Sequence, residues 1–457
     1  MLIPGKMGVA YNLTNPHLVY DSIPSSQAQI PTFPAVKQNR AVFDYYEEPQ
    51  AGSYLPELLY QHFHNGDLIR EGFFLLTEAS EDEGYKGAFS DKLGLFFGEF
   101  QNKSLREIDF GLLTSPDPLP AFGAVLVDEQ LAYCYPPVVN DFYYGSNGIS
   151  IDYNGIVNEF NADAYVESPK VPMFFVAWII KQIAQKAGVK ITGSFLTHPD
   201  WSSLILYNTK EAENEQLSIA EHLPAMTVVE FLMEIRKVAN LKFDFNTVDR
   251  VLDINFWEDC LAAPTQRDWT SKATVGEKKT PEINTRIQLS MQLDGNDALV
   301  KDRPASFADY LSEETYGNIN GIAKVEMKFS TLAINENGVI ASKQEGQSSL
   351  FGQETKPFSP RLLFWHGLVD DVPTALPSKG SISLSPTALA QTSWKETIAL
   401  RKRMFYLQKN FIVNEADLAK LDFSKKYHCQ GVDYLLAMVN VSVPIKGTAE
   451  CLLIGGI

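Results

Sequence analysis

The sequence has little positive charge for its length. Its 457 residues include 39 Lys and Arg against 56 Asp and Glu, which gives a formal net charge of −17. Phosphate binding requires clustered lysine and arginine, so this balance argues against a nucleic-acid backbone as a bound partner. It suits a soluble surface, or an assembly whose acidic face repels polyanions.

Cysteine and long hydrophobic runs are also scarce. Cys134, Cys260, Cys429 and Cys451 are scattered without a CxxC pair, which argues against a disulfide framework or a zinc site. We expect them to be buried thiols in a protein made in a reducing cytoplasm. No run approaches roughly eighteen apolar residues, so we expect no membrane-spanning segment. The opening MLIPGKMGVAYN lacks the apolar stretch of a secretory signal.

Recognisable catalytic motifs are missing as well. The sequence contains no G-x-S-x-G elbow, Walker loop, H-E-x-x-H pair or dinucleotide-binding fingerprint. Adjacent carboxylates such as Asp370 and Asp371 would point to opposite faces of a strand, which is a poor geometry for an acid/base pair. We therefore expect no enzyme activity, no catalytic residues and no cofactor.

Two groups of residues are candidate metal ligands. His62 and His64 would share one face of a strand, but no third ligand with suitable spacing is visible, so exposed loop histidines are favoured. The acidic cluster Glu78, Glu81, Asp82 and Glu83 lacks the alternating ligand pattern of an EF-hand loop. A solvated hairpin turn is favoured there, and no metal is expected.

The residues that are present predict an α+β protein that is mainly β. A hydrophobic content of 45% is ample for real cores, and the length allows two to four domains. Strand alternation on both sides of an acidic turn predicts a hairpin from Asp67–Thr77 and Tyr85–Phe89. We also predict a strand at Ala41–Tyr45, a polar bridge at 262–285 and a strand meander that closes the chain.

A helix followed directly by a strand occurs twice between residues 171 and 258. The copies run from Val171 to Gly193 and from Met226 to Phe245. A shift of about 52 positions superposes their apolar residues, which is the sign of an internal repeat; chance similarity of two ordinary units is the alternative. Spacings of three and four predict a core-facing stripe on each helix. The predicted core and assembly residues are Val176, Ile179, Ile180 and Ile183, then Val228, Phe231, Leu232 and Ile235.

Local signals support both helix–strand units. Gly188 and Asn240 occupy matching positions, and both residue types tolerate the left-handed conformation that ends a helix. Thr227 and Glu230 have the spacing of a capping box. The run that ends at Trp257 alternates cleanly, so we predict that 248–257 pairs with Leu241–Asn246 and packs its apolar face on the second helix.

We expect four consecutive parts. They are a β-barrel-like domain at 1–111, a loop-rich surface excursion with its own hairpin at 112–170, the duplicated helix–strand segment at 171–260, and a second β-rich barrel-like domain at 261–457.

Short stretches spread over most of the chain carry a family resemblance. They are residues 33–43, 68–76, 176–193, 227–257, 324–330, 361–367 and 411–453. Their order is similar to that in the tail-tip (baseplate) hub proteins of tailed bacteriophages, especially those of Bacteroidetes phages and prophages. Residues 112–170 match no part of that pattern.

The resemblance implies a structural virion protein at the tail tip, assembled in the cytoplasm of the bacterial host. It implies a ring, typically a homotrimer, that continues the lumen of the tail tube. The implied partners are further copies of the chain, the tail tube or distal tail protein, and spike or fibre proteins. DNA would pass through the lumen without specific binding.

Two other functions are kept as alternatives. One is an adaptor ring of different symmetry, such as a hexameric distal tail protein. The other is a carbohydrate-binding or carbohydrate-cleaving protein, because all-β modules rich in tyrosine and tryptophan often bind sugars.

Overall fold

The chain folds into two compact units, each assembled from separated segments. The computed structural model describes residues 8–22, 27–29, 32–51, 58–64, 66–91, 97, 100, 102–146, 148, 153–246, 249–314 and 320–457. Unit 1 comprises Met1–Phe96, Asp259–Ile283 and Leu400–Ile457, and unit 2 comprises Phe97–Glu258 and Asn284–Ala399. The four consecutive parts expected above stay a prediction, whereas the α+β, mainly β class is confirmed.

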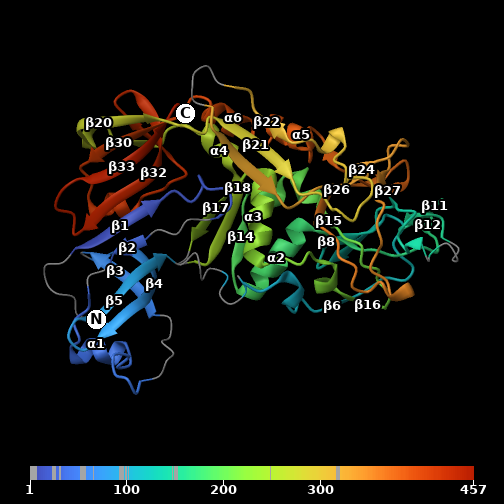
Figure 1. Ribbon diagram of the computed structural model, residues 1–457, viewed down its shortest axis with the longest axis horizontal. Coiled ribbons are helices and arrows are strands. Elements are labelled where there is room, and N and C mark those ends of the chain that lie inside the picture. The colour runs from blue at the N-terminus through green and yellow to red at the C-terminus, as the bar shows by residue number, and fades with distance from the viewer. Residues whose placement is uncertain are drawn as a thin grey trace. The chain divides into compact units, whose positions relative to one another are not determined.

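Unit 1 is built on an eleven-stranded sheet with the order β20-β30-β33-β32-β1-β2-β5-β4-β3 and with β19 and β31 off this path. Strands from both ends of the chain therefore share one sheet, the blue and red arrows of Figure 1. Its strands are β1 (Val9–Thr14), β2 (Gln27–Gln29), β3 (Leu58–His64), β4 (Asp67–Ser80), β5 (Gly84–Asp91), β19 (Arg267–Asp268), β20 (Ala273–Pro281), β30 (Phe405–Phe411), β31 (Lys426–Cys429), β32 (Val432–Val443) and β33 (Ala449–Gly455). The short helix α7 (Glu415–Ala419) belongs to this unit.

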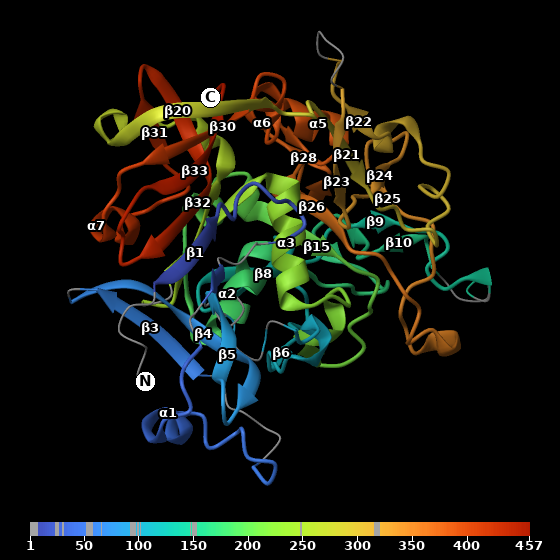
Figure 2. The ribbon, with the colours of Figure 1, turned by 60° about the vertical axis from the view of Figure 1, so that its left-hand side comes forward.

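Strand alternation places the core of unit 1. In β1, Val9, Tyr11 and Leu13 are buried, and the residues between them are more exposed. Figure 2 shows β1 between β32 and the blue N-terminal strands, as its pairings require. The predicted hairpin of 67–77 and 85–89 is confirmed by the pairing of β4 with β5. The predicted C-terminal meander is confirmed for β31, β32 and β33, which pair in chain order, whereas β30 pairs with β33 and not with β31.

The prediction of a strand at Ala41–Tyr45 is wrong. Helix α1 (Lys37–Val42) occupies the start of this segment. The chain turns immediately after this helix, where Asp44 and Tyr45 have positive φ values of 50° and 53°. Phe43 is thereby buried and stacks on Tyr85, with 4.1 Å between the ring centroids. A tertiary aromatic contact, rather than local alternation, decides the conformation of this segment.

The polar bridge predicted at 262–285 is also wrong in part. Residues 273–281 form β20, which pairs antiparallel with β30 at the end of the sheet path. Most of its side chains are exposed, so the sequence shows no apolar alternation. The partner strand supplies the hydrogen bonds that hold an edge strand of this kind in place.

Unit 2 contains several smaller sheets. Those used below are a six-stranded sheet with the order β27-β26-β15-β13-β8-β7 and a three-stranded sheet with the order β14-β18-β17. The strands of unit 2 are β6 (Leu112–Thr114), β7 (Ala124–Val127), β8 (Gln130–Cys134), β9 (Val138–Val139), β10 (Ile156–Val157), β11 (Phe160–Asn161), β12 (Ala164–Tyr165), β13 (Met173–Phe175), β14 (Lys190–Thr192), β15 (Leu204–Tyr207), β16 (Gln216–Ser218), β17 (Leu241–Asn246), β18 (Val251–Phe256), β21 (Arg286–Met291), β22 (Tyr310–Leu311), β23 (Ile322–Met327), β24 (Ala333–Ile334), β25 (Ile340–Ala341), β26 (Arg361–Val369), β27 (Val372–Leu376), β28 (Ser378–Lys379) and β29 (Ile382–Ser383). Its helices are α2 (Val176–Ala187), α3 (Val228–Ala239) and α5 (Pro386–Gln391), while α4 (Trp257–Ala262) and α6 (Lys395–Arg401) lie where the chain passes between the units.

The two predicted helix–strand units are confirmed as α2 with β14 and α3 with β17. The left-handed ends are Gly188, with φ 63°, and Asn240, with φ 48°, and the Thr227–Glu230 capping box is present. The predicted pairing of β17 with β18 is antiparallel and is also confirmed. β14 pairs with the other edge of β18 in parallel, so the two copies share one central strand.

Helix α3 is buried on nearly all sides, although the sequence marks only one apolar face. Glu234 and Lys237 are buried together, with 2.8 Å between Lys237 Nζ and Glu234 Oε1. Lys237 also donates to the carbonyl of Glu326, and the backbone N–H of Lys328 donates to Glu234 at 2.7 Å. Backbone groups at the end of β23 thus provide hydrogen-bond partners for the two buried charged side chains.

Part of segment 112–170, for which a surface excursion is expected, is buried in unit 2. The expected hairpin is present as β7 and β8, but β8 lies inside the six-stranded sheet. Tyr133, Tyr135 and Tyr143 are almost completely buried, at 0–1% exposure. The dense tyrosines of this region therefore build the core of unit 2.

None of the four cysteines forms a disulfide. Cys134, Cys429 and Cys451 are buried, as the sequence predicts, whereas Cys260 is half-buried. Burial raises the pKa of the Cys451 thiol to about 12, which makes it unreactive at neutral pH. Among the described residues, no helix is long and apolar enough to cross a membrane.

Candidate assembly surfaces

The predicted core and assembly residues lie in the interior of unit 2. The exposed fractions are at most 3% for Val176, Ile179, Ile180, Ile183, Val228, Phe231, Leu232 and Ile235. They hold α2 and α3 in place and do not form a surface that another molecule can contact. Any effect of these residues on assembly is therefore indirect, and that effect stays a prediction.

The exposed edge strand β3 is the first surface suited to assembly. In the described part of the chain β3 pairs only with β4, so its other edge presents backbone groups. Leu59 and Phe63 on β3 are 69% and 55% exposed, and Leu75 on β4 is 52% exposed. This hairpin therefore carries apolar side chains on both faces, of which only one packs on the core.

The strand β20 closes the other end of the sheet path and is the second such surface. Among described strands it pairs only with β30. Val275 is fully exposed and Ile283, just beyond the strand, is 63% exposed. Lys278 and Lys279 are exposed on this strand, and the Lys279 ammonium lies 3.7 Å from the centroid of the Phe405 ring. The edge thus carries exposed apolar side chains and two lysines, together with the half-exposed Glu277, which pairs with Lys409.

The acidic turn between β4 and β5 is solvated, which confirms the expectation. Glu78, Glu81, Asp82 and Glu83 are exposed, and Lys86 pairs with Glu78 at 3.3 Å and with Glu83. Exposed ion pairs of this kind contribute little to stability. The turn instead gives the β3–β5 end of the sheet a negative charge.

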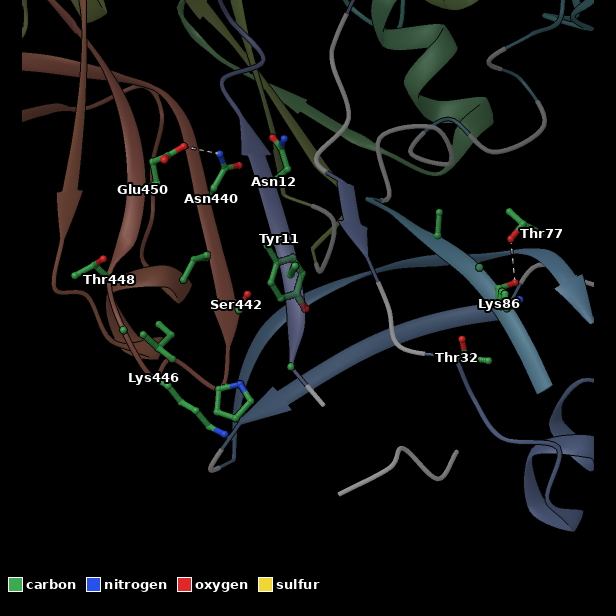
Figure 3. A pocket seen from close by; sticks show the side chains of 18 residues that line it. Tyr11, Asn12, Thr32, Thr77, Lys86, Asn440, Ser442, Lys446, Thr448 and Glu450 are labelled. Atoms are coloured by element: carbon green, nitrogen blue, oxygen red, sulfur yellow. Dashed lines mark hydrogen bonds between the residues drawn. The ribbon is translucent and has the colours of Figure 1, made fainter. Parts of the chain in front are cut away.

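An open pocket of about 1120 Å³ adjoins β1, β5, β32 and β33 of the unit 1 sheet. Asn12, Asn440 and Glu450 stand in register across β1, β32 and β33, and Asn440 donates to Glu450 at 3.3 Å (Figure 3). The remaining wall combines five hydroxyl side chains and two lysines, Lys86 and Lys446, with five apolar side chains, among them Val441 and Ile445. The lining suits hydrogen bonding to a passing or bound molecule.

The candidate ligands His62 and His64 belong to β3 (Leu58–His64). His62 lies on β3, not in a loop, and its Nδ1 is 2.6 Å from the Tyr11 hydroxyl. The side chain of His64 lies outside the described residues. Among the residues that the structure does describe, no group of three or more His, Cys, Asp or Glu side chains could hold a metal ion.

A buried histidine in unit 2 was missed by the sequence reading. His222 is 2% exposed, and its Nδ1 lies 3.2 Å from Asn208 Oδ1. Burial, with further contributions from Lys210 and Arg106, lowers the pKa of His222 to about 3. A lone histidine in an irregular segment gives no sequence signal, because only the fold surrounds it with Phe174 and neighbouring cations.

We expect His222 to make the protein sensitive to mild acid. Folding lowers the pKa of His222. The contribution of its neutral imidazole to the free energy of unfolding is therefore fully present above pH 6.5 and is lost as the pH falls towards 3. Between pH 6.5 and 5 the free energy of unfolding should fall by about 2 kcal/mol through this group. Denaturant unfolding of wild type and His222→Gln at both pH values measures the difference.

A second histidine provides the control for this experiment. His366 Nε2 donates one hydrogen bond to the carbonyl of Ser378, and the side chain is half-buried. His366→Gln removes an imidazole from the same unit without opening the His222 site. Equal acid sensitivity of wild type and His222→Gln would show that the buried imidazole is not responsible.

Comparison with known proteins gave only distant structural matches. No protein-family description matches the chain, and no curated protein matches it. Its fold is similar to that of a 43 kDa tail protein of prophage MuSo2 from Shewanella oneidensis, with 8% identity, a TM-score of 0.40, and coverage of 99% of this chain and 93% of that one. It is also similar to a tail protein from Neisseria meningitidis MC58, with 9% identity, a TM-score of 0.38, and coverage of 98% and 96%. A third similar structure is the prophage tail protein gp18 from Listeria monocytogenes EGD-e, with 8% identity, a TM-score of 0.37, and coverage of 98% and 87%.

Proposed function

We propose that the protein is a structural component of a phage tail tip. Copies of it form a ring-shaped hub that continues the lumen of the tail tube and anchors spike or fibre proteins. The observation that carries the proposal is the sheet of unit 1, whose path among the described strands ends at β3 and at β20. Both edges present apolar side chains that a partner strand would cover.

The two edges differ in charge, which favours head-to-tail association. β20 carries Lys278 and Lys279, whereas the β3–β5 end carries the acidic turn that includes Glu78 and Glu81. Joining β3 of one copy to β20 of the next brings unlike charges together, and joining like edges does not. Repeated head-to-tail contacts close into a ring when the rotation between copies allows it.

The charge of the whole chain fits the same role. A net charge of −17 disfavours adhesion of DNA to the protein, as a tail lumen requires. The resemblance of the short sequence stretches to tail-tip hubs favours a trimer. A hexamer in solution would instead favour the distal tail adaptor.

Reversing the charge of the β20 edge should prevent ring formation. The double variant Lys278→Glu with Lys279→Glu places negative charge opposite the acidic β3–β5 end, and like charges across an interface disfavour association. By mass photometry we expect wild type at three times the 51.1 kDa of one chain and the variant at one chain mass. Circular dichroism should show that the variant remains folded, because both lysines are exposed.

A matched variant in unit 2 controls for the change in net charge. Lys324 and Lys343 are exposed there, and reversing both to glutamate changes the total charge by the same amount. This control should assemble as wild type does. A wild-type protein that stays monomeric at high concentration, or a β20 variant that still assembles, contradicts the proposed ring.

A further inference from the structure

Two hairpins of unit 2 end in the same sequence pattern. Leu126-Val-Asp-Glu129 closes the hairpin of β7 and β8, and Leu368-Val-Asp-Asp371 closes the hairpin of β26 and β27. Val127 pairs with Gln130 and Val369 pairs with Val372, so each loop consists of two acidic residues. The two hairpins form the opposite ends of the six-stranded sheet.

The two tips lie at the same end of that sheet. Each strand is antiparallel to its neighbour from β7 to β27, so β7 and β26 run in the same direction and their loops project from one end. The sheet is also curled. A Cβ atom built on Gly123, just before β7, would lie only 2.6 Å from Cβ of Pro373 on β27. The start of β7 therefore lies against β27, close to the turn of the β26–β27 hairpin.

The loop residues are unfavourable for the turns that they form. Asp128 and Glu129 have φ values of 49° and 62°, and Asp370 and Asp371 have 49° and 61°. Two-residue hairpin loops with positive φ at both positions favour Asn-Gly or Asp-Gly, because a side chain at the second position is strained. The hairpin of β31 and β32 in unit 1 does place glycine there, as Gln430-Gly431. Asp370 and Asp371 are thus neighbours in a turn and not on a strand.

Exposed aliphatic side chains adjoin both acidic tips. Leu126 faces Leu131 across β7 and β8, and they are 53% and 42% exposed. Val369 faces Val372 across β26 and β27, and they are 44% and 40% exposed. Leu368 is 46% exposed beside them. Apolar side chains gathered at exposed tips, with strained acidic residues between them, indicate binding rather than folding.

The charge of the tips selects the kind of partner. All four loop residues are exposed carboxylates, so a second copy of the same face would bring carboxylates against carboxylates. Nucleic acid and anionic lipid are disfavoured for the same reason. A protein surface that places lysine or arginine beside apolar side chains is complementary in both respects.

We propose that these two hairpin tips form a docking surface for a partner protein with a basic, apolar strand or hairpin. This docking surface rests on the proposed assembly role and extends it, because it assigns a binding site for a partner protein other than another copy of the chain. It lies in unit 2, whereas the ring edges lie in unit 1. Oligomeric state tests the ring and peptide binding tests the docking surface, so the failure of either proposal can be distinguished from the failure of the other.

The test replaces the acidic loops with the residues that the turns favour. The variant carries Asp128→Asn, Glu129→Gly, Asp370→Asn and Asp371→Gly. We expect its melting temperature to rise, because the loops lose strain and charge repulsion. Its affinity for a fluorescein-labelled hairpin peptide of alternating lysine and valine, measured by fluorescence anisotropy on the full chain, should fall at least tenfold.

A second variant that removes four carboxylates elsewhere is the matched control. Asp302→Asn, Glu326→Gln, Glu336→Gln and Glu354→Gln remove four other exposed carboxylates of unit 2 and change the formal charge by the same amount. This control should bind the peptide within twofold of wild type. Equal weakening of both variants would show diffuse electrostatic attraction and would overturn the proposal, as would a wild-type protein that does not bind the peptide.

A third variant tests the apolar part of the surface. Leu126→Ser with Leu368→Ser leaves every charge in place and changes side chains that are already about half exposed. We expect this variant to stay folded and to bind the peptide at least fivefold more weakly. Unchanged binding would show that the aliphatic side chains take no part and would likewise overturn the docking surface.

Discussion

Replacing Arg361 with leucine is expected to destabilise unit 2 severely. Arg361 is completely buried at the start of β26, where its guanidinium pairs with Asp294 at 2.9 Å and Asp297 at 2.6 Å. Burial opposes ionisation of Asp294, but Arg361 and two backbone N–H groups outweigh it, so the pKa of Asp294 is lowered. Removing the cation leaves two buried carboxylates without their partner, which costs about 3–5 kcal/mol.

Urea unfolding followed by tryptophan fluorescence measures this loss. The control is Lys343→Leu, because Lys343 pairs with Asp141 at 3.4 Å and both side chains are largely exposed. That surface pair should contribute less than about 1 kcal/mol. Adding Asp294→Asn and Asp297→Asn to Arg361→Leu should recover part of the stability, since the uncompensated charges are then gone. Similar stability of Arg361→Leu and Lys343→Leu would contradict the importance of the buried pair.

Replacing Leu232 with aspartate is expected to abolish soluble assembly. Leu232 is 3% exposed on α3, a helix that is packed on nearly all sides. Its neighbour Phe231 contacts Phe329 with 6.0 Å between ring centroids, so the helix is held between β23 and the three-stranded sheet. An unpaired carboxylate in this core should cost more than about 4 kcal/mol, because both burial of charge and lost apolar contact contribute.

The same helix supplies the control. Val229 is 38% exposed, so Val229→Asp places the same charge on the outside of α3. The yield of soluble protein and its mass in solution should be near wild type for Val229→Asp and should collapse for Leu232→Asp. A folded Leu232→Asp variant that still forms a ring would count against the role assigned to the repeated helices.

Strongly periodic segments could be predicted from the sequence. The helices α2 and α3 have clear stripes and local end signals, namely Gly188, Asn240 and the Thr227–Glu230 box, which act within a few residues. The hairpin of β4 and β5 has alternation on both sides of a polar turn. Such features depend on neighbouring residues alone, so the rest of the chain does not need to be known.

The surfaces proposed for assembly could not be predicted in the same way. The strand β20 is almost entirely exposed and shows no alternation, so only its pairing with β30 makes it a strand. The acidic pair Asp370–Asp371 resembles a polar stretch until β26 and β27 place it at a hairpin tip. The second tip lies more than 200 residues away in sequence, and only the curled sheet brings the start of β7 against β27.

The sequence by itself determined where periodic helices and hairpins form, that the core is ample, and that the surface is acidic, because composition and short-range spacing decide these properties. Only the tertiary structure decided which strands share a sheet, why polar residues such as Glu234 and Lys237 are buried, and where exposed edges remain. The physical reason is that strand pairing and charge burial depend on residues far apart in the chain, whose encounter no local pattern encodes.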